Sequence, residues 1–152
     1  MFGYFKKRRQ LKALYKILNL WYNACILEIN SKDLFEPRPK LGCVCFFIGS
    51  IDSVCQSLGF SDETFLEIAL NFFKEKTFYK FDDIASSVLL NYFGNNQRVK
   101  FAKDNMKIGM DAYRDWYNSS FLSKTPIERF MNLIREWNRK PNLEGDELFL
   151  LI

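Results

Sequence analysis

The sequence contains no histidine among its 152 residues. Histidine is the commonest general acid–base residue and the commonest metal ligand, so its absence removes the usual means of much enzyme chemistry. No nucleotide-binding motif and no catalytic constellation of other residue types stands out either. The sequence therefore favours a protein that is not an enzyme, and we expect no cofactor.

A metal-binding cysteine pattern is also missing. The four cysteines are Cys25, Cys43, Cys45 and Cys55, and no two of them form a CxxC pair. Cys43 and Cys45 lie two positions apart in a predicted helix and so point about 200° from one another. Without histidine, a zinc site would need all four thiolates or a carboxylate. We expect no metal site and free, buried thiols, which are typical of a reducing cytoplasm.

No apolar run is long enough to cross a bilayer. The segment 41–48 is far shorter than the roughly 20 residues that a spanning helix needs. The N-terminal segment is interrupted by Lys12, Lys16 and Asn19, so it lacks the continuous apolar region of a signal peptide. We expect a soluble, cytoplasmic protein with no integral membrane segment.

Aromatic residues are abundant: 16 Phe, 7 Tyr and 3 Trp make up 17% of the chain. An aromatic-rich core is the favoured interpretation, and an exposed aromatic patch for a partner or a second copy is the alternative. No repeat, low-complexity tract or strand-like alternation appears. We predict a compact all-α bundle of about six helices, formed by one domain over 1–152 with a short tail at 141–152.

The most apolar helix is predicted over roughly 39–58, at the centre of the bundle. Pro39 suits the first helical position, and Gly59 suits the left-handed position just past a helix end. Apolar residues surround most of the first half, which is typical of a helix buried on several sides. Gly42 and Gly49 are seven residues apart on one face, where the lack of a side chain would let a neighbouring backbone come close.

Five further helices are predicted around it. The first is amphipathic and reaches Ile29, and the next begins after a Ser61 cap. The third starts at Asp82 and Asp83 and stops at Gly94. The fourth runs to Asn118 from a cap at Asn95 or Asn96, and the last begins at a capping box, Thr125 to Glu128, with Pro126 at the first helical position. The acidic and then apolar tail is predicted to dock as a strand-like segment or to lie loose.

Basic residues are concentrated at the N-terminus, where six lie close together: Lys6, Lys7, Arg8, Arg9, Lys12 and Lys16. On an anionic membrane, six such charges supply at most roughly 6 kcal/mol, which is too little for a sole anchor. A solvated, solubilising helix start is the favoured interpretation. Binding of nucleic acid or of a membrane surface is the alternative.

Asp52 is a lone carboxylate on an otherwise apolar helix. If it were buried near another acid, its pKa would rise and it could serve as an acid or base in a polar pocket. Ser53 and Gln56 flank it on the same face, which favours exposure or a hydrogen bond instead. An enzyme or small-ligand site at Asp52 is therefore the third functional hypothesis.

A group at 113–117 has the residue types that dominate protein interfaces: Tyr113, Arg114, Trp116 and Tyr117. A core role for the two tyrosines is the alternative, because they continue an apolar stripe. The leading hypothesis is a small helical accessory, inhibitor or immunity-type regulator that acts by binding another protein. Self-association is a second expectation, and nucleic acid or a membrane surface ranks below a protein partner.

Overall fold

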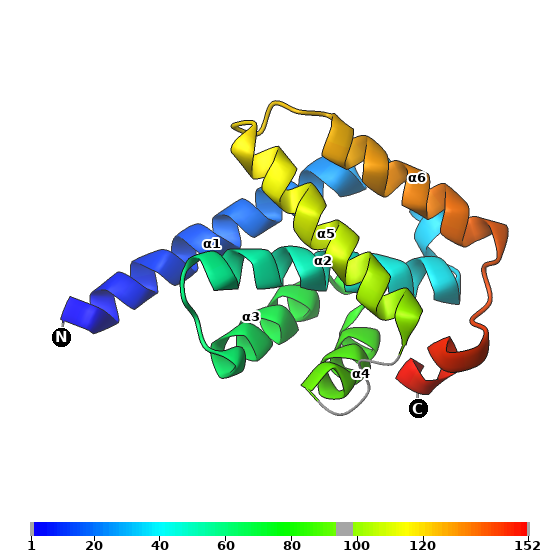
Figure 1. Cartoon of the computed structure of the whole chain (residues 1–152), viewed down its shortest axis with the longest axis horizontal. Helices are drawn as coiled ribbons and strands as arrows, with labels where there is room; N and C mark the ends of the chain where they lie inside the picture. The colour runs from blue at the N-terminus through cyan, green and yellow to red at the C-terminus, as the bar shows by residue number, and fades with distance from the viewer. Residues whose placement is uncertain (1, 94–98, 152) are drawn as a thin grey trace.

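The computed structural model describes residues 2–93 and 99–151, and within them all regular secondary structure is helical, without strands. Six α-helices and three short 3-10 helices (η) pack into one bundle, which confirms the predicted all-α class (Figure 1). In chain order the elements are α1 (Phe2–Ile26), η1 (Ser31–Leu34), α2 (Pro37–Ser57), α3 (Asp62–Glu75), η2 (Thr77–Tyr79), α4 (Asp82–Phe93), α5 (Lys100–Asn118), α6 (Thr125–Arg139) and η3 (Gly145–Leu151).

Helix α2 is the buried centre of this bundle, as predicted. Every residue over 41–51 is buried, and the other helices surround it (Figure 1). The helix begins at Pro37, two residues before the predicted start, because both prolines fit the first turn, where a backbone N–H has no partner within the helix. Gly59 follows the helix with φ of 68°, which confirms its predicted left-handed conformation.

Helices α2 and α5 run in the same direction and cross at a pair of glycines (Figure 1). A side chain on Gly49 would collide with the carbonyl group of Met106, and one on Gly109 would collide with that of Phe46. Gly42 instead lies under the ring of Trp137. The close backbone approach predicted at both glycines is therefore confirmed at Gly49 and wrong at Gly42, whose neighbour is a side chain.

The core is rich in aromatic side chains, and a short polar chain crosses it. Trp21 of α1 stacks on Phe46 at 6.0 Å between ring centroids. Its indole Nε1 donates a hydrogen bond of 2.9 Å to Ser50 Oγ, which lies 3.0 Å from the carbonyl oxygen of Gly109. Both side chains are fully buried, so these contacts satisfy polar atoms that would otherwise be left without water. Helices α1, α2 and α5 are joined at this point.

The predicted helix ends have different outcomes: α1 ends at Ile26 and not at the predicted Ile29. Helix α3 begins after Ser61, whose side chain accepts from Thr64 N at 3.2 Å, as predicted. Helix α5 begins only at Lys100, whereas the predicted start at Asn95 or Asn96 and the stop at Gly94 lie outside the described residues.

The start of α6 and the tail also need correction. Lys124 is the N-cap of α6 and makes no side-chain capping hydrogen bond, so Thr125 is already helical and Pro126 occupies the second position. The tail docks, but as the 3-10 helix η3 and not as a strand-like segment, with Leu150 buried beneath it. A 3-10 turn lets Leu150 reach the bundle while the backbone hydrogen-bonds locally.

Helix α1 extends well beyond the rest of the molecule at its N-terminal end (Figure 1). Residues 3–9 are all exposed, and the helix first becomes buried at Leu14. Among the described residues, no helix is both long and apolar enough to span a membrane.

Candidate functional site

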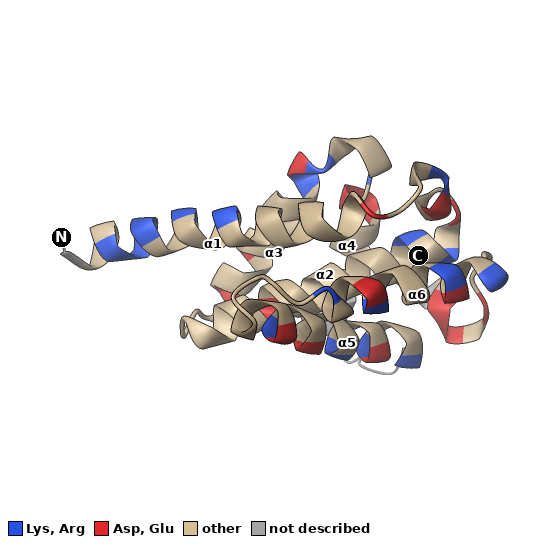
Figure 2. Cartoon of the chain, turned by 90° about the horizontal axis from the view of Figure 1, so that it is seen from above, with Lys and Arg blue, Asp and Glu red and all other residues tan. Residues whose placement is uncertain are grey.

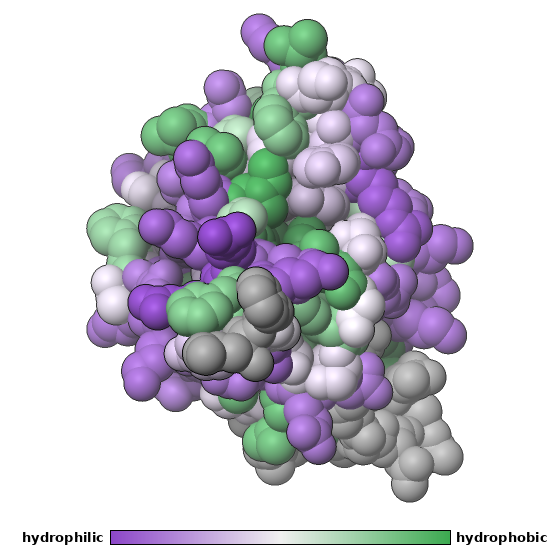
Figure 3. Space-filling view, turned by 90° about the vertical axis from the view of Figure 1, so that its left-hand side faces the viewer, coloured by the Kyte–Doolittle hydropathy of each residue, from purple (hydrophilic) through white to green (hydrophobic). Residues whose placement is uncertain are grey.

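A groove of about 980 Å³ lies between the middle of α1 and the C-terminal ends of α2 and α5. We call it the α1/α2/α5 groove. Its lining residues are Gln10, Ala13, Leu14, Ile17, Ser53, Val54, Gln56, Ser57, Leu58, Tyr113, Arg114, Tyr117, Asn118 and Phe121. On the side of the molecule where α1 projects, apolar residues run through the middle of the face between hydrophilic ones (Figure 3).

The floor of the groove is made of buried, mainly apolar side chains. Leu14 comes from α1, Val54 from α2 and Tyr113 from α5, and each is at most 6% exposed. Arg114 Nε donates a hydrogen bond of 3.0 Å to Ser53 Oγ, which ties α5 to α2 across the floor. The floor is therefore fixed by packing and by a hydrogen bond between two of its three helices.

An aromatic lip stands at one edge of the groove. Tyr117 and Phe121 are 53% and 48% exposed, with ring centroids 5.8 Å apart. Phe121 also lies 4.7 Å from the ring of Trp116, which is buried and packs 5.0 Å from Trp21. The two exposed rings are thus held by a buried aromatic cluster, and little side-chain freedom would be lost if a partner covered them.

The turn after α5 holds Phe121 in an unusual backbone conformation. Ser120 and Phe121 have φ of 56° and 68°, in the left-handed region that residues with side chains rarely adopt. Phe121 N donates to Trp116 O at 3.0 Å, and Ser119 Oγ accepts from Ser123 N at 2.9 Å. These hydrogen bonds maintain a conformation that brings a large ring back against the end of α5.

Charge is distributed unevenly around the groove. Arg114 is the one charged residue in the lining, and no lining residue is acidic. Helix α1, which forms one wall, has six Lys or Arg residues and no Asp or Glu. In Figure 2 the basic residues of α1 lie along its N-terminal part, whereas acidic and basic residues alternate on α5. The groove wall is the most strongly basic element of the described chain.

The predicted partner-binding residues divide into two groups. Tyr113, Arg114 and Tyr117 line the groove, and Trp116 supports the lip from behind, where it is 4% exposed. Phe121 was missed: its sequence signal was only the apolar pair with Leu122 in a polar loop. The contribution of α1 was missed as well, because Ile17 looks like any other member of an amphipathic helix.

The other candidate residues lie beside this site. All six predicted basic residues, Lys6, Lys7, Arg8, Arg9, Lys12 and Lys16, are exposed along α1. Asp52 is half-buried outside the groove lining, and its carboxylate accepts a hydrogen bond of 3.1 Å from Nε2 of Gln56, which does line the groove.

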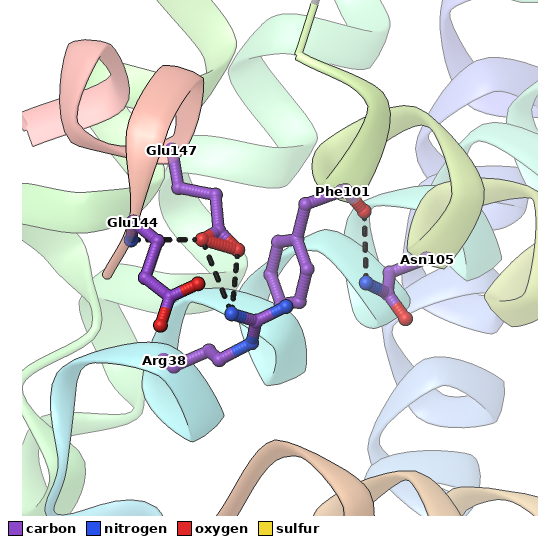
Figure 4. Close-up of polar contacts among 5 residues, drawn as sticks. All are labelled: Arg38, Phe101, Asn105, Glu144 and Glu147. Atoms are coloured by element: carbon purple, nitrogen blue, oxygen red, sulfur yellow. Dashed lines mark hydrogen bonds and ion pairs between the residues drawn. The ribbon is translucent and has the colours of Figure 1, made fainter. Parts of the chain in front are cut away.

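A second hollow of about 490 Å³ lies between the start of α5 and the end of α6. Arg38 borders it, with its guanidinium 4.7 Å from the Phe101 ring centroid and Nη1 3.0 Å from Glu147 Oε1 (Figure 4). Glu147 Oε2 also accepts from Glu144 N at 3.0 Å. The Arg38 guanidinium thus binds Glu147 and attaches the C-terminal segment to α2, so this cluster has a clear structural role.

The cysteines are poorly suited to nucleophilic or metal chemistry. All four are free and buried, as predicted. Burial raises the pKa of Cys25 and Cys43 well above the ordinary value, and burial with the nearby charge of Asp52 raises the pKa of Cys55 to about 12. The reactive thiolate is therefore disfavoured at neutral pH. Within residues 2–93 and 99–151, no group of three or more Cys, Asp or Glu residues could hold a metal ion.

Comparison with known proteins gives no relative: no family model, no curated protein and no solved structure matches this chain.

Proposed function

We propose that this protein acts without catalysis, by receiving a helical segment of another protein in the α1/α2/α5 groove. The observation that carries the proposal is the exposed aromatic lip beside an apolar floor, in a hollow that opens to solvent. An accessory, inhibitor or immunity-type regulator would work in this way. The buried free thiols fit a reducing compartment, and we place the protein in the cytoplasm.

The shape of the site favours a helix as the occupant. Its walls are helices, and the described part of the chain has no strand edge to which an extended peptide could be added. On α1 the lining extends from Gln10 to Ile17, a rise of about 10 Å or two helical turns. A short amphipathic helix could place two turns of apolar side chains along that length.

The lip has the chemical character of an interface hot spot. Tyr is enriched among residues that dominate binding energy, and rings fixed in advance lose little entropy on binding. The left-handed backbone of Phe121 adds to this argument, because strained residues persist where their surroundings impose them and cluster at functional sites. A ring held at the surface in this way is better explained by a contact than by stability alone.

A paired set of variants tests the proposal. Tyr117→Ala/Phe121→Ala removes the lip, and Phe35→Ala/Phe78→Ala removes two comparably exposed rings that do not line the groove. A partner would be captured from native extract by crosslinking, purified, and titrated against each variant by calorimetry. We expect the lip variant to lose at least about tenfold in affinity, or 1.4 kcal/mol, and the control to stay near the unmodified protein. Equal binding by both variants would contradict a role for the groove.

Self-association is separated by measuring the mass of the pure protein by light scattering. A monomer leaves the groove open for a different protein. A dimer that the lip variant converts to monomer would instead make a second copy the occupant. A dimer that survives the lip variant would assign the self-interface to another face.

A second candidate function is binding to an anionic surface through the projecting start of α1. The observation in its favour is that residues 3–9 are exposed on all sides and include four consecutive cations. Lys100 of α5 adds no free charge to this surface, since it is paired with Asp104 at 2.6 Å. Binding to phosphatidylserine vesicles or duplex DNA that Lys6→Gln/Lys7→Gln/Arg8→Gln/Arg9→Gln abolishes would support this candidate.

A further inference from the structure

We infer that the partner helix is acidic as well as apolar, and that the first turns of α1 contact its acidic side chains. This inference rests on the proposed function, because it specifies the chemistry of the occupant of the same groove. Residues 2–9 of α1, which we call the arm, form the extension of the groove wall beyond the body of the molecule (Figure 1).

The arm continues the face of α1 that lines the groove. Gln10, Ala13 and Ile17 line it, and they lie three and four residues apart, on one side of the helix. The same spacing, continued backwards, places Lys6 and Gly3 on that side. A helix that filled the groove and extended past its open end would therefore run alongside Lys6, with Arg9 and Lys7 on the adjacent faces of the arm.

The charged residues that line the groove and those of α1 have one sign. The groove lining contributes Arg114 and no acid, and α1 contributes six exposed cations and no acid. Complementary potential is how interfaces select partners and align them, so the favoured occupant presents Asp or Glu toward α1. Its opposite face must be apolar to cover Leu14, Val54 and the aromatic lip.

The arm also lacks support of its own as a helix. Residues 3–9 are exposed, so burial against the body of the molecule does not stabilise them. Arg8, Lys12 and Lys16 are spaced at i and i+4, where like charges repel, and cations in the first turns oppose the helix dipole. Carboxylates of a partner would neutralise these charges. The arm should therefore become more ordered when the acidic helix binds.

The apolar groove distinguishes this partner from nucleic acid or a lipid surface. Either of those would engage the arm alone, because phosphate contacts need only exposed cations. Tyr4 and Phe5, at 67% and 52% exposure, add apolar area to the arm, but the lip and floor would stay uncovered. A single acidic amphipathic helix covers both the cations and the apolar groove.

The experiment is a selection from a display library of random 16-residue peptides with the full-length protein as bait. Peptides that also bind the Tyr117→Ala/Phe121→Ala variant are removed by counter-selection, so those kept depend on the lip. We expect them to have apolar residues three and four apart and an excess of Asp and Glu over the starting library. Their affinity should fall about tenfold or more for the Lys6→Gln/Lys7→Gln/Arg8→Gln/Arg9→Gln variant, and more at low than at high salt. The matched control, Lys103→Gln/Lys107→Gln on α5, should change it little.

The outcomes separate the two proposals. Lip-dependent peptides without acid enrichment, or with affinity unchanged by the arm variant, would overturn the acidic partner and leave groove binding intact. Recovery of no lip-dependent peptide would count against groove binding itself. Arm-dependent binding of phosphatidylserine vesicles or duplex DNA that the lip variant does not weaken would assign the arm to an anionic surface.

Hydrogen exchange gives a second readout on the unmodified protein. Amides of residues 6–9, which bond to carbonyls within α1, should exchange rapidly in the free protein and at least about tenfold more slowly with a selected acidic peptide bound. Unchanged exchange of the arm in that complex would overturn its part in the site.

Discussion

Gly49 and Gly109 contact each other's helices reciprocally: each lies against the backbone carbonyl three residues before the other glycine. Because the two helices run in the same direction, the contact at one glycine has the same form as the contact at the other (Figure 1). Two backbones can approach this closely only where neither residue has a side chain. This crossing sets the positions of α2 and α5, and therefore the width of the groove between their C-terminal ends.

Replacing either glycine by alanine should strongly destabilise the protein. The added methyl group would meet backbone atoms, which cannot rotate away, so Gly49→Ala and Gly109→Ala should each lower the free energy of unfolding by about 3 kcal/mol or more. Urea denaturation would measure the change. Gly3→Ala is the matched control, since open space surrounds that position, and it should be neutral or stabilising by up to about 1 kcal/mol. An equal loss in all three variants would contradict the packing argument.

Ser120→Gly should stabilise the protein. Its φ of 56° is strained for serine, whereas glycine adopts this conformation readily. Removing the strain should raise the free energy of unfolding by about 1 kcal/mol, partly offset by the greater freedom of glycine in the unfolded chain. Thermal unfolding would show a higher midpoint. Asn118→Gly, two residues earlier in the last turn of α5, should lower the midpoint, because a helical position favours residues with side chains. Shifts of the same sign in both variants would refute the assignment of strain to Ser120.

Stability should fall in alkaline solution. The pKa of the buried thiols is raised in the folded state, while the same groups in the unfolded chain titrate near their ordinary pKa of 9.0. Above that pH the unfolded state binds fewer protons than the folded state, so each fully buried thiol favours unfolding by up to about 1.4 kcal/mol per pH unit. Urea midpoints under reducing conditions should therefore be equal at pH 7 and 8 and clearly lower at pH 10. The Cys55→Ala variant should show a smaller fall, and a flat profile to pH 10 would disprove the mechanism.

Glu147→Gln should loosen the C-terminal segment. The carboxylate pairs with Arg38 at 3.0 Å and is only 9% exposed, so loss of its charge should reduce the free energy of unfolding by about 1–3 kcal/mol. Faster hydrogen exchange over 141–150 would show that the effect is local. Asp104→Asn breaks the exposed pair with Lys100 and should change stability by no more than about 0.5 kcal/mol. Unaltered exchange of the segment in Glu147→Gln would exclude its role as the attachment.

The helices themselves could be predicted because their causes are local. Each of these signals acts on residues close to it in the sequence. Examples are the apolar residues around the start of α2, the Ser61 cap of α3 and the left-handed Gly59. The exact start of α2 could not be chosen from sequence, since Pro37 and Pro39 both suit a first turn. In each case the periodic pattern predicts the helix, and it gives the ends of that helix only to within a few residues.

The groove could be predicted only in part, because its causes are not local. Tyr113, Arg114 and Tyr117 could be named from residue type, but the side chains facing them belong to α1 and α2 and depend on how three helices cross. Gly109 looked like an ordinary position in an amphipathic helix, since the carbonyl that requires it belongs to Phe46. Phe121 had no signal for a left-handed residue, which is usually glycine or asparagine.

The pairing of α2 with α5 also affects the newly made chain. Gly109 follows Gly49 by 60 residues (109 − 49), so the most apolar helix leaves the ribosome well before the helix that covers it. At a synthesis rate of about 5–20 residues per second, roughly 3–12 s pass between the synthesis of Gly49 in α2 and that of Gly109 in α5. During synthesis the centre of the future core is therefore a surface on which chaperones can act, and a chain that stops before α5 leaves that surface uncovered.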